Sequence, residues 1–340
     1  MQLKPSGKLI LAGDIGGTKT LLQVAEVAGD RVRVLGEQRF ESAAFTGLVP
    51  MVQTFLQSFS GSDIPLHAIQ SACFGVAGPV NGRQADLTNL PWKLDADEMV
   101  RTCGIPHVTL INDFAAIGYG IAALEPQDCV TLQPGKPVAQ GVRVILGAGT
   151  GLGVCFLIWS GDHYQVVSSE GGHMDFAPAD ELQAGLLHYL RPSLGHVSCE
   201  RIVSGSGLVA IYQYLREQTA GAEAPALQRA MQEGDPAAAI SECALAGQDM
   251  VAASALTMFV RIYGAQAGNL ALALLARGGV YVAGGIAPKI MAEMRAGGFM
   301  QAFLDKGRYR EMLADFPVQV IVNEKVGLMG AALVASRLAS

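Results

Sequence analysis

The sequence is poor in aromatic residues, lacks clustered cysteines and has no long uninterrupted apolar run. Phe, Trp and Tyr make up 6% of the 340 residues, which argues against an extended base-stacking surface. The six cysteines lie at least 26 residues apart, so they form no CxxC pair or zinc-type cluster. The most apolar long segment, 251–276, is interrupted by Arg261, Gln266 and Asn269 and therefore favours a buried helix over a membrane span.

Charge is also scarce, and its balance is slightly acidic. Only 16% of residues are charged, with a net charge of −6, so no polyanion-binding footprint for nucleic acid or an anionic membrane is expected. The apolar stretch 9–13 is too short for the hydrophobic core of a signal peptide, which indicates a cytoplasmic protein. Half of the residues are hydrophobic, and a chain of this length is expected to form two domains.

Hydrophobic periodicity predicts an α/β chain in which an opening pattern of strands is repeated. The expected strands are 8–13, 20–27, 31–40, 68–77, 108–111, 142–146, 154–159, 164–168, 279–283 and 318–322. The expected helices are 48–59, 114–123, 208–216, 250–275 and a last one from residue 327. A glycine-rich turn separates the first two strands of each half, so the repeat places two similar loops at corresponding positions.

The first of these loops has the residues of a phosphate-binding turn. Glycines let the backbone approach phosphate oxygens and present N–H groups to them, and a carboxylate at the same turn can hold Mg²⁺ through water. The candidate nucleotide-binding residues here are Gly13, Asp14, Ile15, Gly16, Gly17 and Thr18, with Asp14 as the magnesium partner. An ordinary hairpin turn is the alternative for this loop taken alone.

Two further glycine clusters strengthen the nucleotide interpretation. Gly149, Thr150 and Gly151 belong to the second loop, and Gly284 and Gly285 follow a buried strand, where bare backbone can lie against an adenosine. The sequence contains no GxxxxGK[ST] motif, and a strand rather than a helix follows the first two clusters, so neither a Walker loop nor a dinucleotide fold fits. The order of the three clusters is typical of the actin, hexokinase and heat-shock ATPase superfamily and indicates ATP.

Three more motifs carry a resemblance to a known family. Residues 110–114 (LINDF), 169–176 (SEGGHMDF) and 195–201 (GHVSCER) resemble the sugar-binding motifs of bacterial glucokinases, and with the glycine loops they span nearly the entire chain. The resemblance implies transfer of the γ-phosphoryl group of Mg-ATP to the 6-hydroxyl of glucose. It implies Asp113 as the catalytic base, which also contacts the sugar. The other implied sugar ligands are Asn89, Asn112, Glu170, His173 and Glu200.

The chemistry of these residue types agrees with those roles. A sugar hydroxyl is a poor nucleophile, so a carboxylate within hydrogen-bond reach must accept its proton during in-line transfer. Carboxylates and amides bind the paired hydroxyls of a hexose well. Taken singly, Asp113 also reads as a helix cap, the two glutamates as surface charge and His173 as a structural histidine. No zinc spacing connects His173 and Asp175 with the other histidines.

The sequence departs from the bacterial glucokinase pattern at one position. Two other classes of function, a DNA-binding repressor and an ATPase, are alternatives to a kinase. Lys19 stands where that family usually has Asn, and GGTK is commoner in the repressor, open-reading-frame and kinase (ROK) family. The cysteine-rich zinc motif of ROK proteins is missing, which favours the non-ROK group. A DNA-binding repressor would need a helix-turn-helix ahead of the first loop, and an actin- or chaperone-like ATPase would leave the sugar motifs unexplained.

The resemblance also implies an architecture. We expect a two-domain ribonuclease-H-like fold, of the actin-like ATPase and hexokinase type, with an interdomain cleft. The small domain is expected over 1–123 plus 323–340 and the large domain over 124–322. Glucose and ATP are the expected partners, without nucleic acid or membrane, and a cytoplasmic homodimer is the expected assembly.

Overall fold

The computed structural model describes residues 7–62, 64–87, 90–219 and 224–338. The chain forms two compact units. The first comprises residues 1–126, 164–168 and 323–340, and the second comprises residues 127–163 and 169–322. The two units are described in turn.

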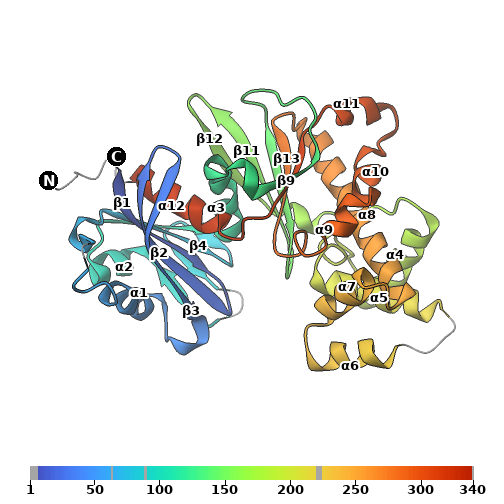
Figure 1. Cartoon of the computed structure of the whole chain (residues 1–340), viewed down its shortest axis with the longest axis horizontal. Coiled ribbons are helices and arrows are strands. Elements are labelled where there is room, and N and C mark those ends of the chain that lie inside the picture. The colour runs from blue at the N-terminus through green and yellow to red at the C-terminus, as the bar shows by residue number, and fades with distance from the viewer. Residues whose placement is uncertain (1–6, 63, 88–89, 220–223, 339–340) are drawn as a thin grey trace. The chain divides into compact units, whose positions relative to one another are not determined.

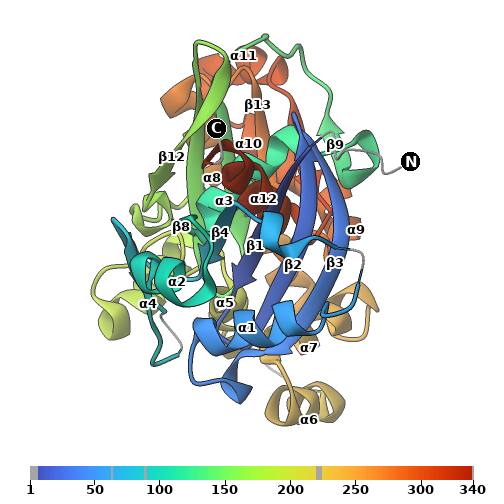
Figure 2. The same cartoon turned by 90° about the vertical axis from the view of Figure 1, so that its left-hand side faces the viewer.

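A five-stranded sheet in the order β3-β2-β1-β4-β8 forms the centre of the first unit (Figures 1 and 2). Its strands are β1 (Lys8–Ile15), β2 (Lys19–Ala28), β3 (Arg31–Glu41), β4 (Ser71–Val76) and β8 (His107–Asn112). β1, β2 and β3 form an antiparallel meander, whereas β1, β4 and β8 run parallel. The carboxyl ends of the three parallel strands therefore meet at one edge, where Ile15, Val76 and Asn112 are in register.

Helices cover both faces of this sheet (Figure 1). The helices of the unit are α1 (Leu48–Gln57), α2 (Ala96–Cys103), α3 (Asp113–Gly120) and α12 (Val326–Leu338). Apolar residues of α1 and α2 share a core with one face of the sheet, and α12 packs on the other face. A small sheet of β5 (Val80–Asn81), β6 (Gln84–Asp86) and β7 (Lys93–Asp95) completes the unit.

The sequences of α3 and α12 allow these helices to pack very closely. A Cβ at Gly330 would lie 1.8 Å from the carbonyl oxygen of Ala116, and one at Gly120 would lie 2.0 Å from that of Val326. Glycine at both positions therefore lets the two backbones approach. This contact fixes α3, whose first residue is Asp113.

A six-stranded sheet in the order β12-β11-β10-β13-β14-β9 forms the centre of the second unit, although residues 164–168 of its edge strand β12 are grouped with the first unit. Its strands are β9 (Cys129–Gln133), β10 (Arg143–Ala148), β11 (Leu152–Ser160), β12 (His163–Ser169), β13 (Gly279–Ala283) and β14 (Val318–Ile321). β10 and β11 are antiparallel, while β10, β13 and β14 run parallel. The arrangement of β10 and β11 thus repeats that of β1 and β2.

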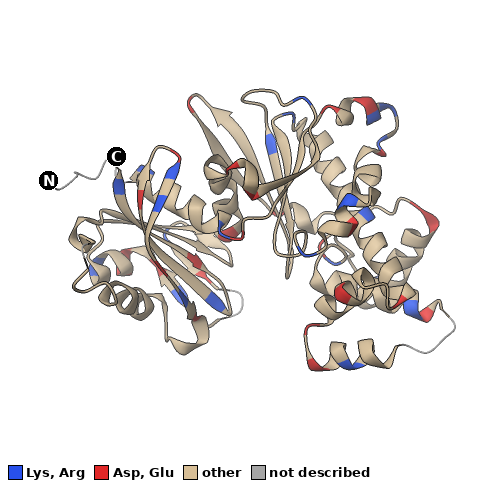
Figure 3. Ribbon diagram, viewed as in Figure 1, with Lys and Arg blue, Asp and Glu red and all other residues tan. Residues whose placement is uncertain are grey.

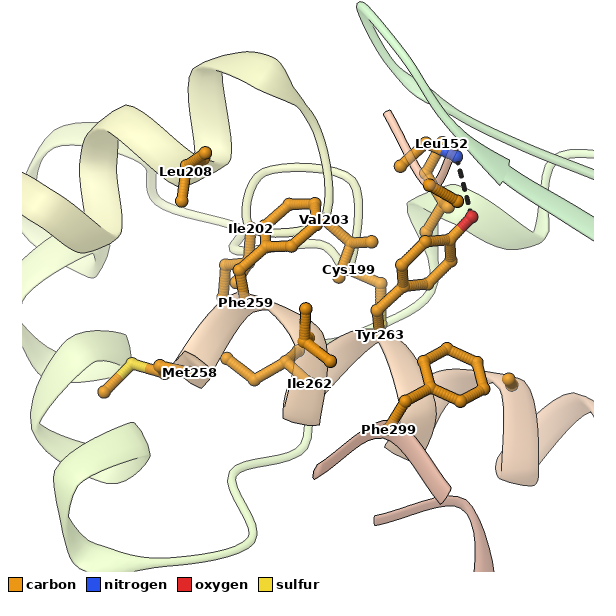
Figure 4. Packing of buried hydrophobic residues seen from close by; sticks show 14 of the residues in the cluster. Leu152, Cys199, Ile202, Val203, Leu208, Met258, Phe259, Ile262, Tyr263 and Phe299 are labelled. Atoms are coloured by element: carbon orange, nitrogen blue, oxygen red, sulfur yellow. Dashed lines mark hydrogen bonds between the residues drawn. The ribbon is translucent and has the colours of Figure 1, made fainter. Parts of the chain in front are cut away.

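Helices surround the buried core of the second unit. They are α4 (Glu181–Leu194), α5 (Gly205–Glu217), α6 (Pro225–Glu233), α7 (Pro236–Leu245), α8 (Met250–Leu274), α9 (Met291–Arg295), α10 (Gly298–Leu304) and α11 (Arg310–Ala314). α8 lies in the middle of this core, and Phe259, Ile262 and Tyr263 on it are almost fully buried (Figure 4).

Most of the expected elements form, with shifts of a few residues at their ends. The expected strand 68–77 is shorter, because a 3-10 turn occupies Leu66–Ala68 and the strand spans Ser71–Val76. The expected helix 114–123 is α3 followed by a 3-10 turn at Ile121–Ala123. Several elements were not individually predicted: the 14-residue helix α4, the 10-residue helix α7, and the shorter β5–β7, β9, α2, α6 and α9–α11.

Two broad features of composition are visible in the structure. Lys and Arg are interspersed with Asp and Glu over the elements of both units (Figure 3). Within the described ranges no single helix is long and apolar enough to cross a membrane, although α7 and α8, bent by 103° at their junction, meet that test as a pair.

Candidate active site

The first glycine loop is a tight turn between β1 and β2, tied down from the end of β3. The N–H of Gly16 donates to the carbonyl of Lys19 at 3.0 Å, which closes the turn. Ser42, just after β3, donates its hydroxyl to the carbonyl of Gly16 at 2.9 Å and its N–H to that of Thr18 at 2.9 Å. The Ser42 hydroxyl also bonds that of Thr20 at 3.0 Å, and both side chains are fully buried. The loop thus has a fixed shape, with Thr18 and Lys19 exposed.

Asp113 and Asp14 lie at the carboxyl edge of the first sheet. β8 ends at Asn112, whose Oδ1 caps α3 by accepting from the N–H groups of Phe114 and Ala115 at 3.0 and 3.2 Å. Asp113 is the first residue of α3, and burial raises its pKa above the ordinary value. Burial, with a contribution from the charge of Asp113, raises the pKa of Asp14 to about 6. Two carboxyl groups with raised pKa values at one edge are a common sign of a functional site.

Three of the expected sugar ligands converge in the second unit. His173 Nε2 lies 3.8 Å from Glu170 Oε2, and His173 Nδ1 lies 3.9 Å from Glu200 Oε1. The side chain of Glu170 is 92% exposed, that of His173 59% and that of Glu200 29%. The cluster therefore offers polar groups to solvent on one side while Glu200 is held by the protein on the other.

Backbone hydrogen bonds bring the two motifs that carry this cluster together. Glu200 donates its N–H to the carbonyl of Gly172 at 2.8 Å, and Cys199 donates to that of Met174 at 2.8 Å. Glu200 Oε2 also accepts the N–H of Leu152, at the start of β11, at 2.9 Å. The carboxylate thus lies directly against the second glycine loop. A Cβ at Gly151 would lie 2.4 Å from the same oxygen, so only glycine leaves room for it.

A cavity of about 600 Å³ in the second unit joins the second and third glycine clusters. Its lining includes Gly149, Thr150 and Gly285, as the sequence indicated. The sequence analysis missed the other lining residues: Gly205, Ser206, Leu208, Val209, Asp235, Pro236, Ala237, Ala238, Ser241, Ile286, Lys289 and Ile290. The available signals were the cap Ser204 before α5 and the pair Asp235-Pro236 that begins α7, since both mark helix starts.

Helix starts and glycines shape this cavity for an anionic ligand. The N–H of Gly205, the first residue of α5, donates to the carbonyl of Gly149 at 2.9 Å, so the start of this 13-residue helix borders the second loop. A Cβ at Gly149 or at Gly285 would meet no atom within 4 Å. Neither glycine is therefore required by the packing of the protein, and both keep the cavity wall open to a close ligand.

The remaining sequence candidates divide between the two units. The first unit holds Asp14, Asn112 and Asp113 near the first loop. The second holds Glu170, His173 and Glu200 beside the second loop. Asn89 lies outside the described residues. In the part of the chain that the structure describes, no three His, Cys, Asp or Glu side chains gather closely enough to hold a metal ion by themselves.

Two similar strand-turn-strand glycine loops, a third cluster at a buried strand end and carboxylates at the first and second loops define a sugar kinase of the ribonuclease-H-like superfamily. Residues 11–338 match the family model described as Glucokinase. Glucokinases of Nostoc sp. and Synechocystis sp. are 48% and 46% identical to the chain, each over 97% of the chain and 99% of the relative. The crystal structure of a glucokinase from an Antarctic psychrotroph superposes with a TM-score of 0.84 at 29% identity, covering 97% of this chain and 99% of the other.

The chain belongs to the glucokinase family, and its activity is the ATP-dependent phosphorylation of glucose.

Proposed function

We propose that Asp113 is the general base that accepts the proton of the 6-hydroxyl of glucose as the γ-phosphoryl group of ATP transfers to it. The raised pKa of Asp113 makes it a stronger base at neutral pH than an exposed aspartate, provided that it is ionised. Its position at the start of α3 is fixed by the Asn112 cap and by the close contact of α3 with α12. No covalent intermediate is needed, because positioning and electrostatic stabilisation account for most of the catalysis of phosphoryl transfer.

We propose that Glu170, His173 and Glu200 bind the hydroxyls of glucose, together with Asn112 and Asn89. The observation that carries this proposal is the bond from Leu152 N–H to Glu200, which ties a sugar ligand to the second phosphate loop. The other oxygen of Glu200 faces His173, so the pair can accept from and donate to neighbouring hydroxyls. A site of this kind rejects analogues that lack a hydroxyl, since its own polar groups would lose their partners.

We propose that ATP is bound by the glycine loops. In the second unit, the phosphates would lie at Gly149–Gly151 and the start of α5, where the helix dipole favours negative charge. The nucleoside would occupy the rest of the cavity against α7 and Gly285, which Gly284 directly precedes. Residues 13–18 of the first unit would supply further phosphate contacts.

We also propose Mg²⁺ as the metal that accompanies ATP. Asp14 fits this role because its carboxyl is buried beside Asp113, an arrangement in which a cation relieves unfavourable charge. With no cluster of three metal-ligating side chains among the described residues, Asp14 would hold the ion through water while the phosphates supply the remaining oxygens. When bound, the ion neutralises charge on the transferring phosphoryl group.

The remaining features of the proposal concern the whole molecule. We propose a cytoplasmic homodimer of the non-ROK glucokinase group, with glucose and ATP as its ligands and no nucleic-acid or membrane partner. We propose domains of 1–123 plus 323–340 and of 124–322. The interspersed charges of both signs support a protein that acts on small molecules (Figure 3).

Release of ADP from Mg-ATP with a panel of hexoses tests the assignment of the base. In Asp113→Asn, kcat with glucose is expected to fall by roughly 10²–10⁴-fold, the usual contribution of a general base. Asp162→Asn is the control, because the side chain of Asp162 is 92% exposed and lies at the β11–β12 turn. Glucose-independent hydrolysis that the Asp113 substitution leaves unchanged would refute the proposed base and the kinase chemistry together.

A further inference from the structure

The hydroxyl of Tyr263, on α8, lies at the ends of two adjacent strands, β10 and β13. The hydroxyl accepts the backbone N–H of Ala148 at 3.0 Å, the bond drawn as a dashed line to a nitrogen atom in Figure 4. It also lies 3.4 Å from the carbonyl oxygens of Leu146 and Ala283, to either of which it can donate. The side chain is fully buried, and this burial raises the pKa of the hydroxyl, so it stays neutral.

The Ala148 peptide is the place where the two strands separate. The parallel register of β10 and β13 ends at the pair Gly147 and Ala283. Gly284 then turns away with a φ of 82°, a conformation that favours glycine. Ala148 is therefore opposite no residue of β13, and its buried N–H takes the Tyr263 hydroxyl as partner.

The carbonyl of Ala148 completes the link to the third glycine cluster. It accepts the N–H of Ile286 at 3.3 Å, and a Cβ at Gly284 would lie 2.4 Å from its oxygen. Ala148 directly precedes Gly149, and Ala283 directly precedes Gly284. The Tyr263 side chain thus contacts the residues that directly precede the second and third glycine clusters, both of which contribute to the lining of the 600 Å³ cavity. Tyr263 does not itself line the cavity.

We propose that Tyr263 is a positioning residue that sets the spacing between the second and third glycine clusters and thereby the affinity for ATP. The inference rests on the proposed nucleotide site. The hydroxyl carries this role, because the ring alone is already held by edge-to-face contacts with Phe259 and Phe299, at centroid distances of 6.0 and 5.7 Å. Replacing Tyr by Phe keeps the ring and removes only the link between the two loops.

The test measures nucleotide binding and kinetics in Tyr263→Phe. Titration with the non-hydrolysable analogue AMPPNP, below the unfolding temperature of every variant, is expected to show five- to tenfold weaker binding. KM for ATP is expected to rise by a similar factor, whereas KM for glucose stays within twofold of the wild type. Unchanged AMPPNP affinity would overturn the proposal, and so would an equal loss of affinity for glucose, which would indicate general loosening of the core.

Two further variants separate this role from core packing. Tyr214→Phe is the matched control, because Tyr214 is a buried tyrosine of the same core whose hydroxyl lies beside Gly185 on α4, so nucleotide binding should not change. Phe299→Leu keeps the hydroxyl but removes a ring that packs against Tyr263. It is expected to lower stability while AMPPNP affinity stays close to that of the wild type, and a loss of affinity as large as that of Tyr263→Phe would overturn the proposal. If Tyr263→Phe does not fold, hydrogen exchange of the Ala148 amide in the wild type replaces it: AMPPNP is expected to slow this exchange, and an unchanged rate would overturn the proposal.

The proposed function can fail separately. If Gly285→Leu, which fills the cavity wall, binds AMPPNP as tightly as the wild type, the nucleotide lies elsewhere and the proposed site is wrong whatever Tyr263→Phe does. If Gly285→Leu loses binding while Tyr263→Phe does not, the site is correct and only the role of Tyr263 is wrong. A wild-type protein that binds no AMPPNP would overturn both.

Discussion

Asp14, near the end of β1, and Asp113, directly after β8, lie at the carboxyl edge of the first sheet with β4 between their strands, and the negative charge of Asp113 contributes to raising the pKa of Asp14 to about 6. Gly75 on the strand between them makes this approach possible. A Cβ at Gly75 would lie 3.1 Å from Cβ of Ala116 and 3.7 Å from Cα of Asp113. A carboxyl group whose ionisation is disfavoured by burial and by a neighbouring carboxylate indicates a site that gains stability when a cation or a proton arrives.

The raised pKa predicts that the metal-free protein loses stability as pH rises. The folded state holds the Asp14 proton more tightly than the unfolded chain, where the pKa is 3.8. This stabilisation is fully present below about pH 4 and is lost as pH rises through about 6. The loss is on the order of 2–3 kcal/mol, from about two pKa units at 1.36 kcal/mol each.

Denaturant unfolding at pH 5 and pH 7.5, in EDTA, measures about half of this loss, about 1.4 kcal/mol, because pH 5 lies one unit below the folded pKa of about 6. In Asp14→Asn the part of the change that comes from Asp14 should vanish, so the variant is more stable than the wild type at pH 7.5. Equal pH dependence in the two proteins would show that Asp14 titrates normally in the folded state.

The loop that contains Asp14 predicts a role for Ser42. Ser42→Ala removes the hydroxyl bonds to Thr20 and to the carbonyl of Gly16. Because these groups are buried, we expect a loss of about 1–3 kcal/mol in the free energy of unfolding. We also expect a several-fold higher KM for ATP with KM for glucose unchanged, since the first loop would lose its fixed shape.

A buried serine elsewhere in the same unit provides the control. The hydroxyl of Ser336 on α12 donates to the carbonyl of Leu333 at 2.8 Å. Ser336→Ala removes a comparable bond far along the helix from the glycine loop and should leave KM for ATP unchanged. If both variants raise KM for ATP equally, the effect is one of stability and not of loop shape.

Local sequence patterns predicted the repeated strands and the glycine loops, because both depend on near neighbours in the chain. β13 forms over the residues expected, and α3 begins one residue before the expected start, with Asn112 as its cap. Short elements such as β9 and α11 have too few residues to show a period, so tertiary contacts decide them.

The candidate site was predictable only where a motif is continuous in sequence. The contact of Glu200 with Leu152 joins residues 48 positions apart, and nothing local to either residue indicates it. The bond between Tyr263 and Ala148 spans 115 positions. The sequence around Tyr263 predicts only that this residue belongs to a buried helix. The lining residues of the cavity that come from α7 were not predicted for the same reason, since Ala237 and Ala238 have no polar or charged side chain that would indicate a ligand.

The packing of Glu200 on the second loop predicts that Gly151 affects sugar binding. A Cβ at Gly151 would displace the Glu200 carboxylate, which would lose its bond to Leu152. We expect KM for glucose to rise about tenfold in Gly151→Ala, equivalent to about 1.4 kcal/mol for a charge-assisted bond.

A double-mutant cycle isolates this effect. In a Glu200→Ala background the clash is gone, so Gly151→Ala should add little to KM for glucose. Glucose KM values for the four proteins of the cycle are sufficient to decide. Fully additive effects would contradict the prediction, because they would mean that Gly151 acts independently of Glu200.

Gly149 and Gly285, which line the cavity, are predicted to matter for nucleotide binding and not for stability. A Cβ at Gly149 or Gly285 meets no atom within 4 Å, and neither residue has a positive φ, so alanine fits the free protein at both positions. Stability should therefore stay equal or rise by about 0.4–1 kcal/mol, through the lower entropy of the unfolded chain. Binding of AMPPNP should weaken at least tenfold in both variants, because the new methyl group occupies space that the ligand needs.

Gly284 supplies the contrast within the same turn. Its φ of 82° and a Cβ only 2.4 Å from the carbonyl oxygen of Ala148 make alanine strained there, so Gly284→Ala should lose at least about 1–3 kcal/mol of stability. Thermal melts and AMPPNP titrations of the three variants therefore separate glycines that the fold requires from glycines that the ligand requires. If Gly149→Ala or Gly285→Ala binds AMPPNP normally, the open wall at that position serves no nucleotide. If either variant instead has a lower melting temperature than the wild type, the folded protein needs glycine at that position, and the prediction that alanine fits there is wrong.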